Sequence, residues 1–204
     1  MYMKTLKKSL ILSIAGVVLL ASSLFTFSNP AFAAQTTKYT SSGTKYYYSQ
    51  SGWWDFGGNV RSGYNGCGVT AFAIAVSILR GKKITPRAVA EVAYKKKYWG
   101  LTGNTPTSLT KKLAGYYGLK YGTVKKDAKK MAAALVNGRI LVIRSHGSLP
   151  FTSGGHYVTV VGARADGYFK VVDPGHSKYR PKWIKASDFL KSMTSSTTVF
   201  TLSS

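Results

Sequence analysis

The sequence of 204 residues contains one cysteine, Cys67, six acidic side chains and three histidines. A lone cysteine excludes a disulfide bond within the chain. The scarcity of histidine means that an imidazole base could only be His146, His156 or His176. We find no internal repeat and no low-complexity tract, which argues against a repeat architecture.

The N-terminus has the features of a secretory signal. Lys4, Lys7 and Lys8 precede an apolar run from Leu10 to Leu20, and the small-x-small pattern Ala31-Phe32-Ala33 follows. This pattern predicts cleavage after Ala33. A retained membrane anchor is the alternative, but the unbroken apolar run is short for a bilayer span. No cysteine lies near the predicted cleavage site, which argues against a lipoprotein.

Removal of residues 1–33 would leave 171 residues, the length of one domain with a real hydrophobic core. Residues 34–44 are small and polar and are expected to form a flexible leader. Residues 45–204 are expected to form the domain. Its first half has helical patterns and its second half has strand patterns, which predicts an α+β fold.

The local signals for helices and strands are distributed as follows. Residues 45–50 have strand-like aromatic content, and residues 51–65 read as a loop with Trp53, Trp54 and Phe56. Expected helices are a nearly all-round buried one from Val69 to Leu79, one after Thr85-Pro86, one after Thr105 or Thr107, one after Asp127 that ends at Gly138, and a short one at 187–191. Expected antiparallel strands are 139–144, 156–163, 168–173 and 197–202.

The charge balance is strongly basic. Without the three lysines of the signal, 26 basic and 6 acidic side chains remain, a formal charge of +20. The anionic partners to consider are wall polymers, lipid headgroups and extracellular nucleic acid. The basic residues are scattered among aromatics, as in 95–99 and 178–180, and form no recognised nucleic-acid motif. The charge therefore indicates a docking surface, or a general solubility effect, but names no reaction.

Cys67 stands at the front of the central helix, between Gly66 and Gly68. Glycine lets the backbone turn sharply there and lets a substrate approach. The unpaired N–H groups and the positive end of the helix dipole favour a thiolate over a thiol. The alternative is an ordinary packed core cysteine. An exported chain is expected to keep a lone thiol only where it is buried or used.

A base for this thiol is predicted on the sheet. His156 begins one strand, and Asp173 ends the next strand after a turn near Asp166-Gly167. A hairpin centred on about residue 165 would place the imidazole and the carboxylate side by side at one sheet edge. Alternatively, the two are separate strand-end residues. His146 reads as a loop residue. His176 could face solvent or line the cleft that we expect where the Cys67 end of the central helix meets the sheet.

Acyl chemistry also needs hydrogen-bond donors for the developing oxyanion. The backbone N–H of Cys67 is one candidate, and the side-chain amide of Gln50 is a second.

Four features in this order resemble the C39-like branch of papain-fold cysteine peptidases: Gln50, the motif NGCGVTA at 65–71, the motif GHYV at 155–158, and Val172-Asp173-Pro174. The resemblance covers about residues 45–200. It implies a papain-like fold in which Cys67 is the nucleophile, His156 the base, Asp173 its orienting group and Gln50 an oxyanion donor. Two features depart from the family pattern. Val69 stands where many relatives have proline, and Gln50 lies seventeen residues before Cys67, farther than is usual in papain-like enzymes.

We therefore expect a secreted, monomeric cysteine peptidase of a Gram-positive bacterium that acts on peptides at the cell surface, needs no cofactor and docks on anionic wall polymer. The leader-peptide substrates of transporter-linked relatives do not carry over, because the chain shows no transporter segments. Three alternatives stay open. The same residues could serve an amidase or acyltransferase, the chain could be an inactive basic wall-binding module, or Cys67, His156, Asp173 and His176 could bind zinc.

Overall fold

The computed structural model describes residues 46–52, 65–101, 103–145, 155–175, 181–191 and 193–204. The predicted signal and leader, the aromatic residues Trp53, Trp54 and Phe56, and the histidines His146 and His176 lie outside the described residues.

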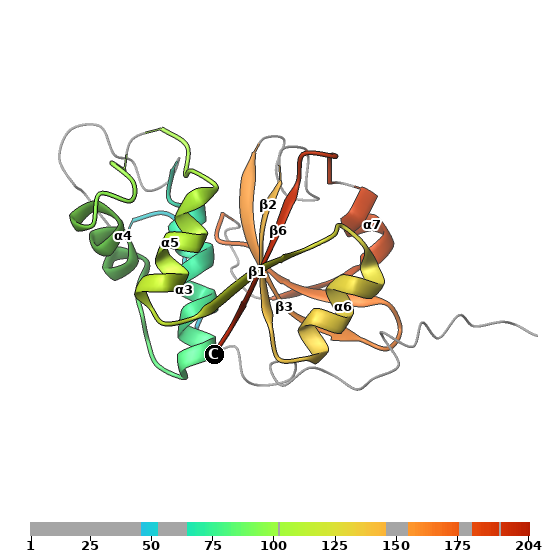
Figure 1. Cartoon of the computed structure of the whole chain (residues 1–204). Coiled ribbons are helices and arrows are strands. Elements are labelled where there is room, and N and C mark those ends of the chain that lie inside the picture. The colour runs from blue at the N-terminus through green and yellow to red at the C-terminus, as the bar shows by residue number, and fades with distance from the viewer. Residues whose placement is uncertain (1–45, 53–64, 102, 146–154, 176–180, 192) are drawn as a thin grey trace, which may run out of the picture.

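The described chain forms three layers (Figure 1). A central sheet has one group of helices on each face. The first group comprises α3 (Cys67–Arg80), α4 (Pro86–Lys95) and α5 (Ser108–Tyr116), and the second comprises α6 (Ala128–Val136) and α7 (Ala186–Lys191). The predicted α+β fold class, with a cysteine-bearing helix packed on an antiparallel sheet, is confirmed.

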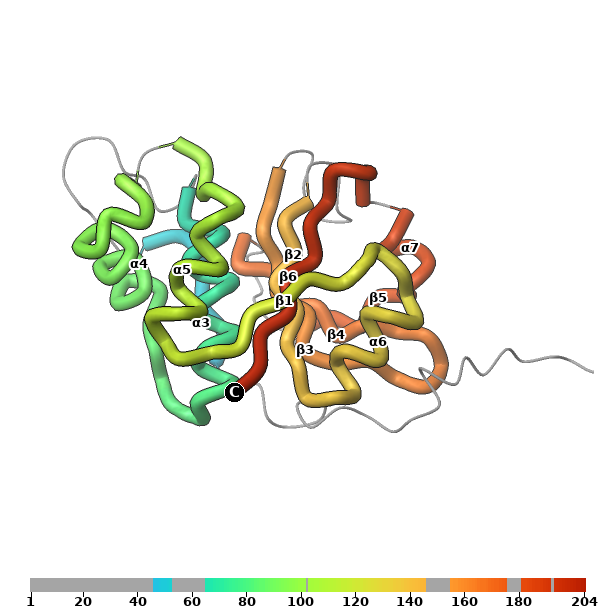
Figure 2. Tube along the Cα trace, in the orientation of Figure 1, coloured from blue at the N-terminus to red at the C-terminus, as the bar shows by residue number. Residues whose placement is uncertain are grey.

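The sheet has six antiparallel strands in the order β1-β6-β2-β3-β4-β5. The strands are β1 (Lys120–Val124), β2 (Ile140–Ser145), β3 (His156–Arg164), β4 (Tyr168–Val172), β5 (Lys182–Lys185) and β6 (Thr198–Ser203). The tube view shows β6, the last strand, crossing back between β1 and β2 (Figure 2). The long strand β3 and its neighbour β2 face α3.

Helix α3 is buried on nearly every side, as its apolar sequence predicts. Twelve of its fourteen residues are buried. The helix ends at Gly81, which has a left-handed φ of 65° that a residue with a side chain rarely adopts.

Two apolar cores lie on the two faces of the sheet, because neighbouring strand residues point to opposite faces. Val142 packs in the core beneath α3, whereas Leu141 packs in the core beneath α6 and α7. Both faces of the central strands are therefore buried, and β3 is buried from His156 to Ala163.

Two predicted helix caps are confirmed. The Thr85 hydroxyl accepts the Ala88 N–H before α4, with Pro86 in the first turn, and the Asp127 carboxylate accepts the Lys130 N–H before α6. Helix α5 begins at Ser108, and its N-cap residue, Thr107, makes no side-chain cap.

Other expectations need correction. Residues 46–50 form no strand. Their tyrosines pack toward α3 instead, where the Tyr48 hydroxyl lies 3.2 Å from the Ser77 hydroxyl. Strands β1 and β5 were not predicted. Each is a short strand at an edge of the sheet, and neither contains a buried residue. Their sequences therefore lack the alternation of apolar and polar residues that predicts a strand. Within the described ranges, no helix has the length and apolarity to cross a bilayer.

Candidate active site

Cys67 is the first residue of α3 and has a relative exposure of 8%. No side chain caps this helix end, because the N-cap position is Gly66. The backbone N–H groups of the first helical turn are consequently available beside the thiol, together with the positive end of the helix dipole.

Thr105 fixes the turn that carries the cysteine. Its hydroxyl donates a 3.0 Å hydrogen bond to the Asn65 carbonyl, and its own carbonyl accepts a 3.3 Å bond from the Tyr157 hydroxyl. Its side chain also packs directly on Gly68, where a Cβ would lie only 2.3 Å from Thr105 Cγ2. The glycine after Cys67 is thus required by a close contact.

A buried hydrogen bond joins the helix to the sheet near the same end. The Thr159 hydroxyl on β3 donates to the Ala71 carbonyl on α3 at 2.8 Å. Ala71 is about one helical turn from Cys67, and Thr159 is about 10 Å along the strand from His156. This bond therefore holds the first turn of α3 close to the first residues of β3.

His156 and Asp173 form a buried pair. His156 Nε2 lies 2.6 Å from Asp173 Oδ1, and the two side chains are 6% and 7% exposed. The same carboxylate oxygen accepts a 2.7 Å hydrogen bond from the Gly175 N–H. The turn after β4 thus orients the carboxylate, and the carboxylate orients the imidazole.

The strand register that produces this pair differs from the predicted one. Arg164 pairs with Tyr168, so the hairpin is centred on residue 166, and the register shifts between Val160 and Gly162. The last regular pair is Thr159 with Val172. Asp173 thus follows the ladder and reaches His156 diagonally across the strand end.

The second ring nitrogen of His156 is the one available to the thiol. Burial alone would lower the pKa of His156, but hydrogen bonds to Asp173 and to Cys67, and the charges of both partners, raise the pKa to about 9. The imidazole therefore stays protonated at neutral pH. Such an imidazolium can hold a thiolate beside it and later donate its proton.

Gln50 is brought to the same place. Its backbone N–H donates a 2.9 Å hydrogen bond to the Pro174 carbonyl, in the turn that also contains Gly175. A Cβ on Gly175 would lie 3.1 Å from His156 Cε1 and 3.2 Å from Gln50 Oε1. The Gln50 side chain and the imidazole therefore both border Gly175, and the absence of a side chain at position 175 makes room for both.

The geometry bears on two of the alternatives. Cys67, His156 and Asp173 do not form a cluster that could hold a metal ion among the described residues. Cys67 also differs from an ordinary core cysteine, because it lies beside a histidine whose pKa it helps to raise and which is itself bonded to a carboxylate. This chain of thiol, imidazole and carboxylate is the arrangement that activates a nucleophile.

Three residues of the site had no assigned role in the sequence analysis. Thr105 carries no local signal, because its partners Asn65 and Gly68 lie about forty positions away. Tyr157 lies within the GHYV motif, and Gly175 follows Asp173-Pro174 in a typical turn sequence, so both could have been considered.

A comparison with models of known protein families shows the family. Residues 45–197 match the Peptidase_C39 like family. Among solved structures, the chain is similar to the peptidase domain of Streptococcus ComA, a bi-functional ABC transporter involved in a quorum sensing pathway, with 17% identity, a TM-score of 0.48 and coverage of 69% of this chain and 93% of that one. It is also similar to xylellain, a cysteine protease from Xylella fastidiosa, with 15% identity, a TM-score of 0.47 and coverage of 86% and 89%. A search of curated proteins finds no match.

The family match spans the cysteine-bearing helix, the histidine strand and the aspartate turn, so it covers every element of the site described above. The resemblance seen in the sequence motifs is confirmed: this chain is a cysteine peptidase of the Peptidase_C39 like family.

Proposed function

We propose that Cys67 is the nucleophile, His156 the general acid and base, Asp173 the group that orients the imidazole, and Gln50 with the Cys67 backbone N–H the oxyanion donors. One observation carries this proposal. His156 is hydrogen-bonded to Asp173 in a buried position, and the neighbouring Cys67 helps Asp173 to raise the pKa of the same imidazole.

The reaction follows from these contacts. The Cys67 thiolate attacks the carbonyl carbon of an amide, and the oxyanion that forms accepts hydrogen bonds from the proposed donors. The His156 imidazolium donates its proton to the leaving amine as the carbon–nitrogen bond breaks. The neutral imidazole then takes a proton from water, which attacks the thioester and releases the acid and the thiolate. Asp173 keeps the imidazole in place through both halves.

We further propose that the peptidase is secreted by a Gram-positive bacterium, works as a monomer and cleaves peptides at or near the cell surface, including peptidoglycan cross-links. The predicted signal at residues 1–33 and the charge of +20 on the remaining chain support this location. N-terminal sequencing of the exported protein should begin at Ala34. A protein that retains Met1 or stays in the membrane would contradict export by a cleaved signal.

The amidase and acyltransferase alternatives use the same residues. An acyltransferase differs from a peptidase in what attacks the thioester, because an amine replaces water, whereas an amidase also uses water and differs in the amide bond that it cleaves. Digestion of a synthetic peptide library and of purified cell wall in H₂¹⁸O separates these reactions. A peptidase incorporates ¹⁸O into the new carboxyl ends of peptides, and Cys67→Ala abolishes the products. Products joined to an added amine would indicate a transferase. The absence of any product with the wild-type protein would leave the inactive binding module as the better account.

A further inference from the structure

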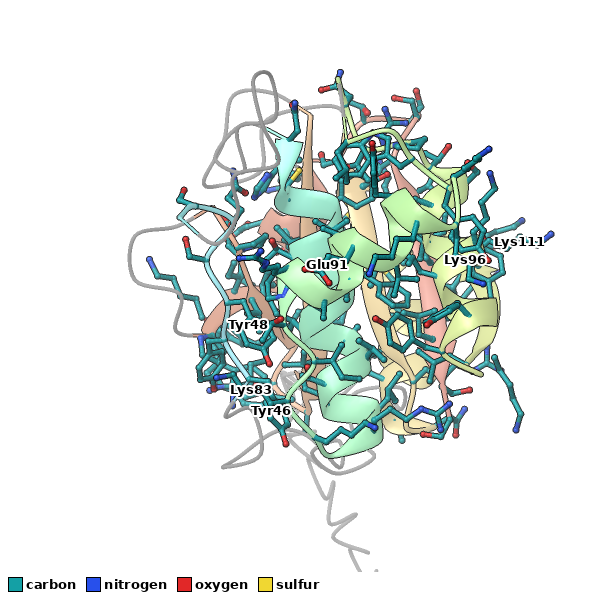
Figure 3. All side chains as sticks on the ribbon, turned by 90° about the vertical axis from the view of Figure 1, so that its left-hand side faces the viewer. Tyr46, Tyr48, Lys83, Glu91, Lys96 and Lys111 are labelled. Atoms are coloured by element: carbon teal, nitrogen blue, oxygen red, sulfur yellow. The ribbon has the colours of Figure 1, made fainter. Side chains whose placement is uncertain are left out.

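The helical half of the molecule, which also carries Cys67, has a strongly basic surface. Residues 65–124 contain ten lysines and arginines and one acidic residue, Glu91. Glu91 forms an ion pair with Arg87 at 3.2 Å, so that pair is already neutralised. Figure 3 shows Glu91 near the centre of this face, with Lys96 and Lys111 to one side and Lys83 to the other.

Two surface pockets meet on this face. The first has a volume of about 520 Å³ and is lined by Tyr46, Tyr48 and Lys83, among others. The second has a volume of about 570 Å³ and extends from Lys82 and Lys83 to Tyr116. Lys83 and Thr85 line both pockets, so the two pockets adjoin in a depression at the turn between α3 and α4.

The depression leads to a row of lysines that lie on tyrosine rings. Lys96 Nζ lies 5.8 Å from the centre of the Tyr116 ring, and Lys112 Nζ lies 5.7 Å from that of Tyr98. We call Lys82, Lys83, Lys96, Lys112, Tyr98 and Tyr116 the tyrosine–lysine track. All four lysines are exposed, and the cation–π contacts hold two of them in place.

We propose that the tyrosine–lysine track binds a linear anionic polymer of the cell surface that carries repeating phosphodiester groups. The inference rests on the proposed location outside the cell. Ammonium groups bind phosphate as point charges and make no demand on a base or a planar ligand. Tyr46, Tyr48, Ser49 and Ser51 also line the first pocket, and this mixed aromatic and polar lining suits a polyol or sugar unit between phosphates.

The exposed side chains argue against two other partners. In the described part of the chain, the exposed large hydrophobic side chains are Tyr94, Tyr116 and Tyr121, so there is no exposed leucine, phenylalanine or tryptophan to insert into a bilayer. Single-stranded nucleic acid binds by stacking bases on open aromatic rings. Here Lys96 lies over the Tyr116 ring and Lys112 over the Tyr98 ring, so a base that stacks on either ring would compete with a lysine.

The second pocket lies at the end of α3 opposite the nucleophile. Cys67 is at one end of α3, and Arg80, which lines the second pocket, is at the other. Thirteen residues of helical rise place these ends about 20 Å apart. A polymer bound over the second pocket would therefore lie at the end of α3 away from Cys67, whereas the first pocket extends to Ser49 and Ser51 on either side of Gln50. Bound in this way, the polymer would hold the enzyme at the wall that carries its substrate.

Binding to poly(glycerol phosphate) tests this proposal directly. The whole protein is measured with Cys67→Ala in every sample, so that binding is read independently of peptide hydrolysis. The track variant carries Lys82→Gln, Lys83→Gln, Lys96→Gln and Lys112→Gln. The control variant carries four exposed lysines changed to glutamine around α6 and α7, at positions Lys125, Lys129, Lys130 and Lys191. Both variants lose the same charge, and thermal unfolding verifies that both are folded.

We expect the track variant to bind the polymer at least tenfold more weakly at 0.1 M salt. The slope of log affinity against log salt concentration should become shallower by about one unit for each lysine that contacts a phosphate. The control variant should bind within about threefold of the parent. Equal losses in the two variants would show binding by net charge alone and overturn the proposal. Oligo(dT) and phosphatidylglycerol vesicles are measured in the same way. If the track binds either of them more tightly than it binds poly(glycerol phosphate), the choice of partner is wrong. Because every sample carries Cys67→Ala, these binding results do not depend on whether the peptidase proposal is correct.

Discussion

Thr105 lies where a side chain on Gly68 would have to be. A Cβ on Gly68 would lie 2.3 Å from Thr105 Cγ2 and 2.7 Å from Thr105 Cβ, although the two residues are 37 positions apart in the chain. Because Gly68 follows Cys67 directly, this contact sets the position of the nucleophile as well as the packing of the helix.

Gly68→Ala should therefore destabilise the protein by about 1–3 kcal/mol, the usual cost of overpacking a core, and should lower kcat/KM because the turn shifts. Denaturant unfolding measures the stability. Gly115→Ala in α5 is the matched control, since no atom lies within 4 Å of its Cβ position, and it should stabilise by up to about 1 kcal/mol. Adding Thr105→Gly should recover part of the loss from Gly68→Ala. If Gly68→Ala is as stable as the parent, the close contact is wrong.

Gln50→Ala tests the proposed oxyanion donor. The loss of one such donor typically lowers turnover by about 10²–10³, while the fold should remain intact. Steady-state kinetics on a small peptide gives kcat, and circular dichroism gives the fold. Ser51→Ala on the same segment is the control and should leave kcat unchanged. If Gln50→Ala also leaves kcat unchanged, another group serves as the donor.

Asp173→Asn should change the pH dependence of the reaction. In the parent, Asp173 helps to raise the pKa of His156 to about 9, so the imidazolium persists up to that pH and activity should fall as pH rises through about 9. Loss of the carboxylate charge should move this alkaline limb to lower pH, toward the ordinary histidine pKa of about 6.5. A pH profile of kcat/KM measures the shift.

The His156–Asp173 pair should also affect the pH dependence of the free energy of unfolding. A histidine whose pKa is raised in the folded state stabilises the fold fully below its unfolded pKa of about 6.5 and loses this contribution as pH rises through about 9. The parent should therefore lose its stability advantage over Asp173→Asn between these values. An identical pH dependence of unfolding in both proteins would show that the carboxylate does not hold the imidazolium.

The sequence predicted the parts of this fold that have local causes. Thr85 and Asp127 each cap a helix, because the side chain accepts a hydrogen bond from a backbone N–H three residues away. The apolar run after Cys67 requires a helix that is buried on nearly all sides. The edge strands β1 and β5 escaped prediction because their residues stay largely exposed and therefore show no strong apolar alternation.

The sequence likewise predicts those features of the site that have a local cause, and misses those that depend on packing between distant segments. His156 and Asp173 could be paired from the sequence because a short hairpin connects them, yet the register shift between Val160 and Gly162 changes how they meet. The position of Thr105 against Gly68 depends on how α3 packs beside the segment that precedes α5, and no local pattern encodes such a contact.

The central claim is that Cys67 and His156 form a reactive pair, and the rate of alkylation by iodoacetamide from pH 5 to 9 tests it most directly. Cys67 is the one cysteine of the chain, so Cys67→Ala gives the blank. The parent should react fast at neutral pH, with or without EDTA. His156→Ala should react slowly there and speed up only toward the pKa of an ordinary thiol, about 8.5, because the cation that holds the thiolate is gone. Identical curves for the parent and His156→Ala would contradict the pairing and, with it, the proposed mechanism.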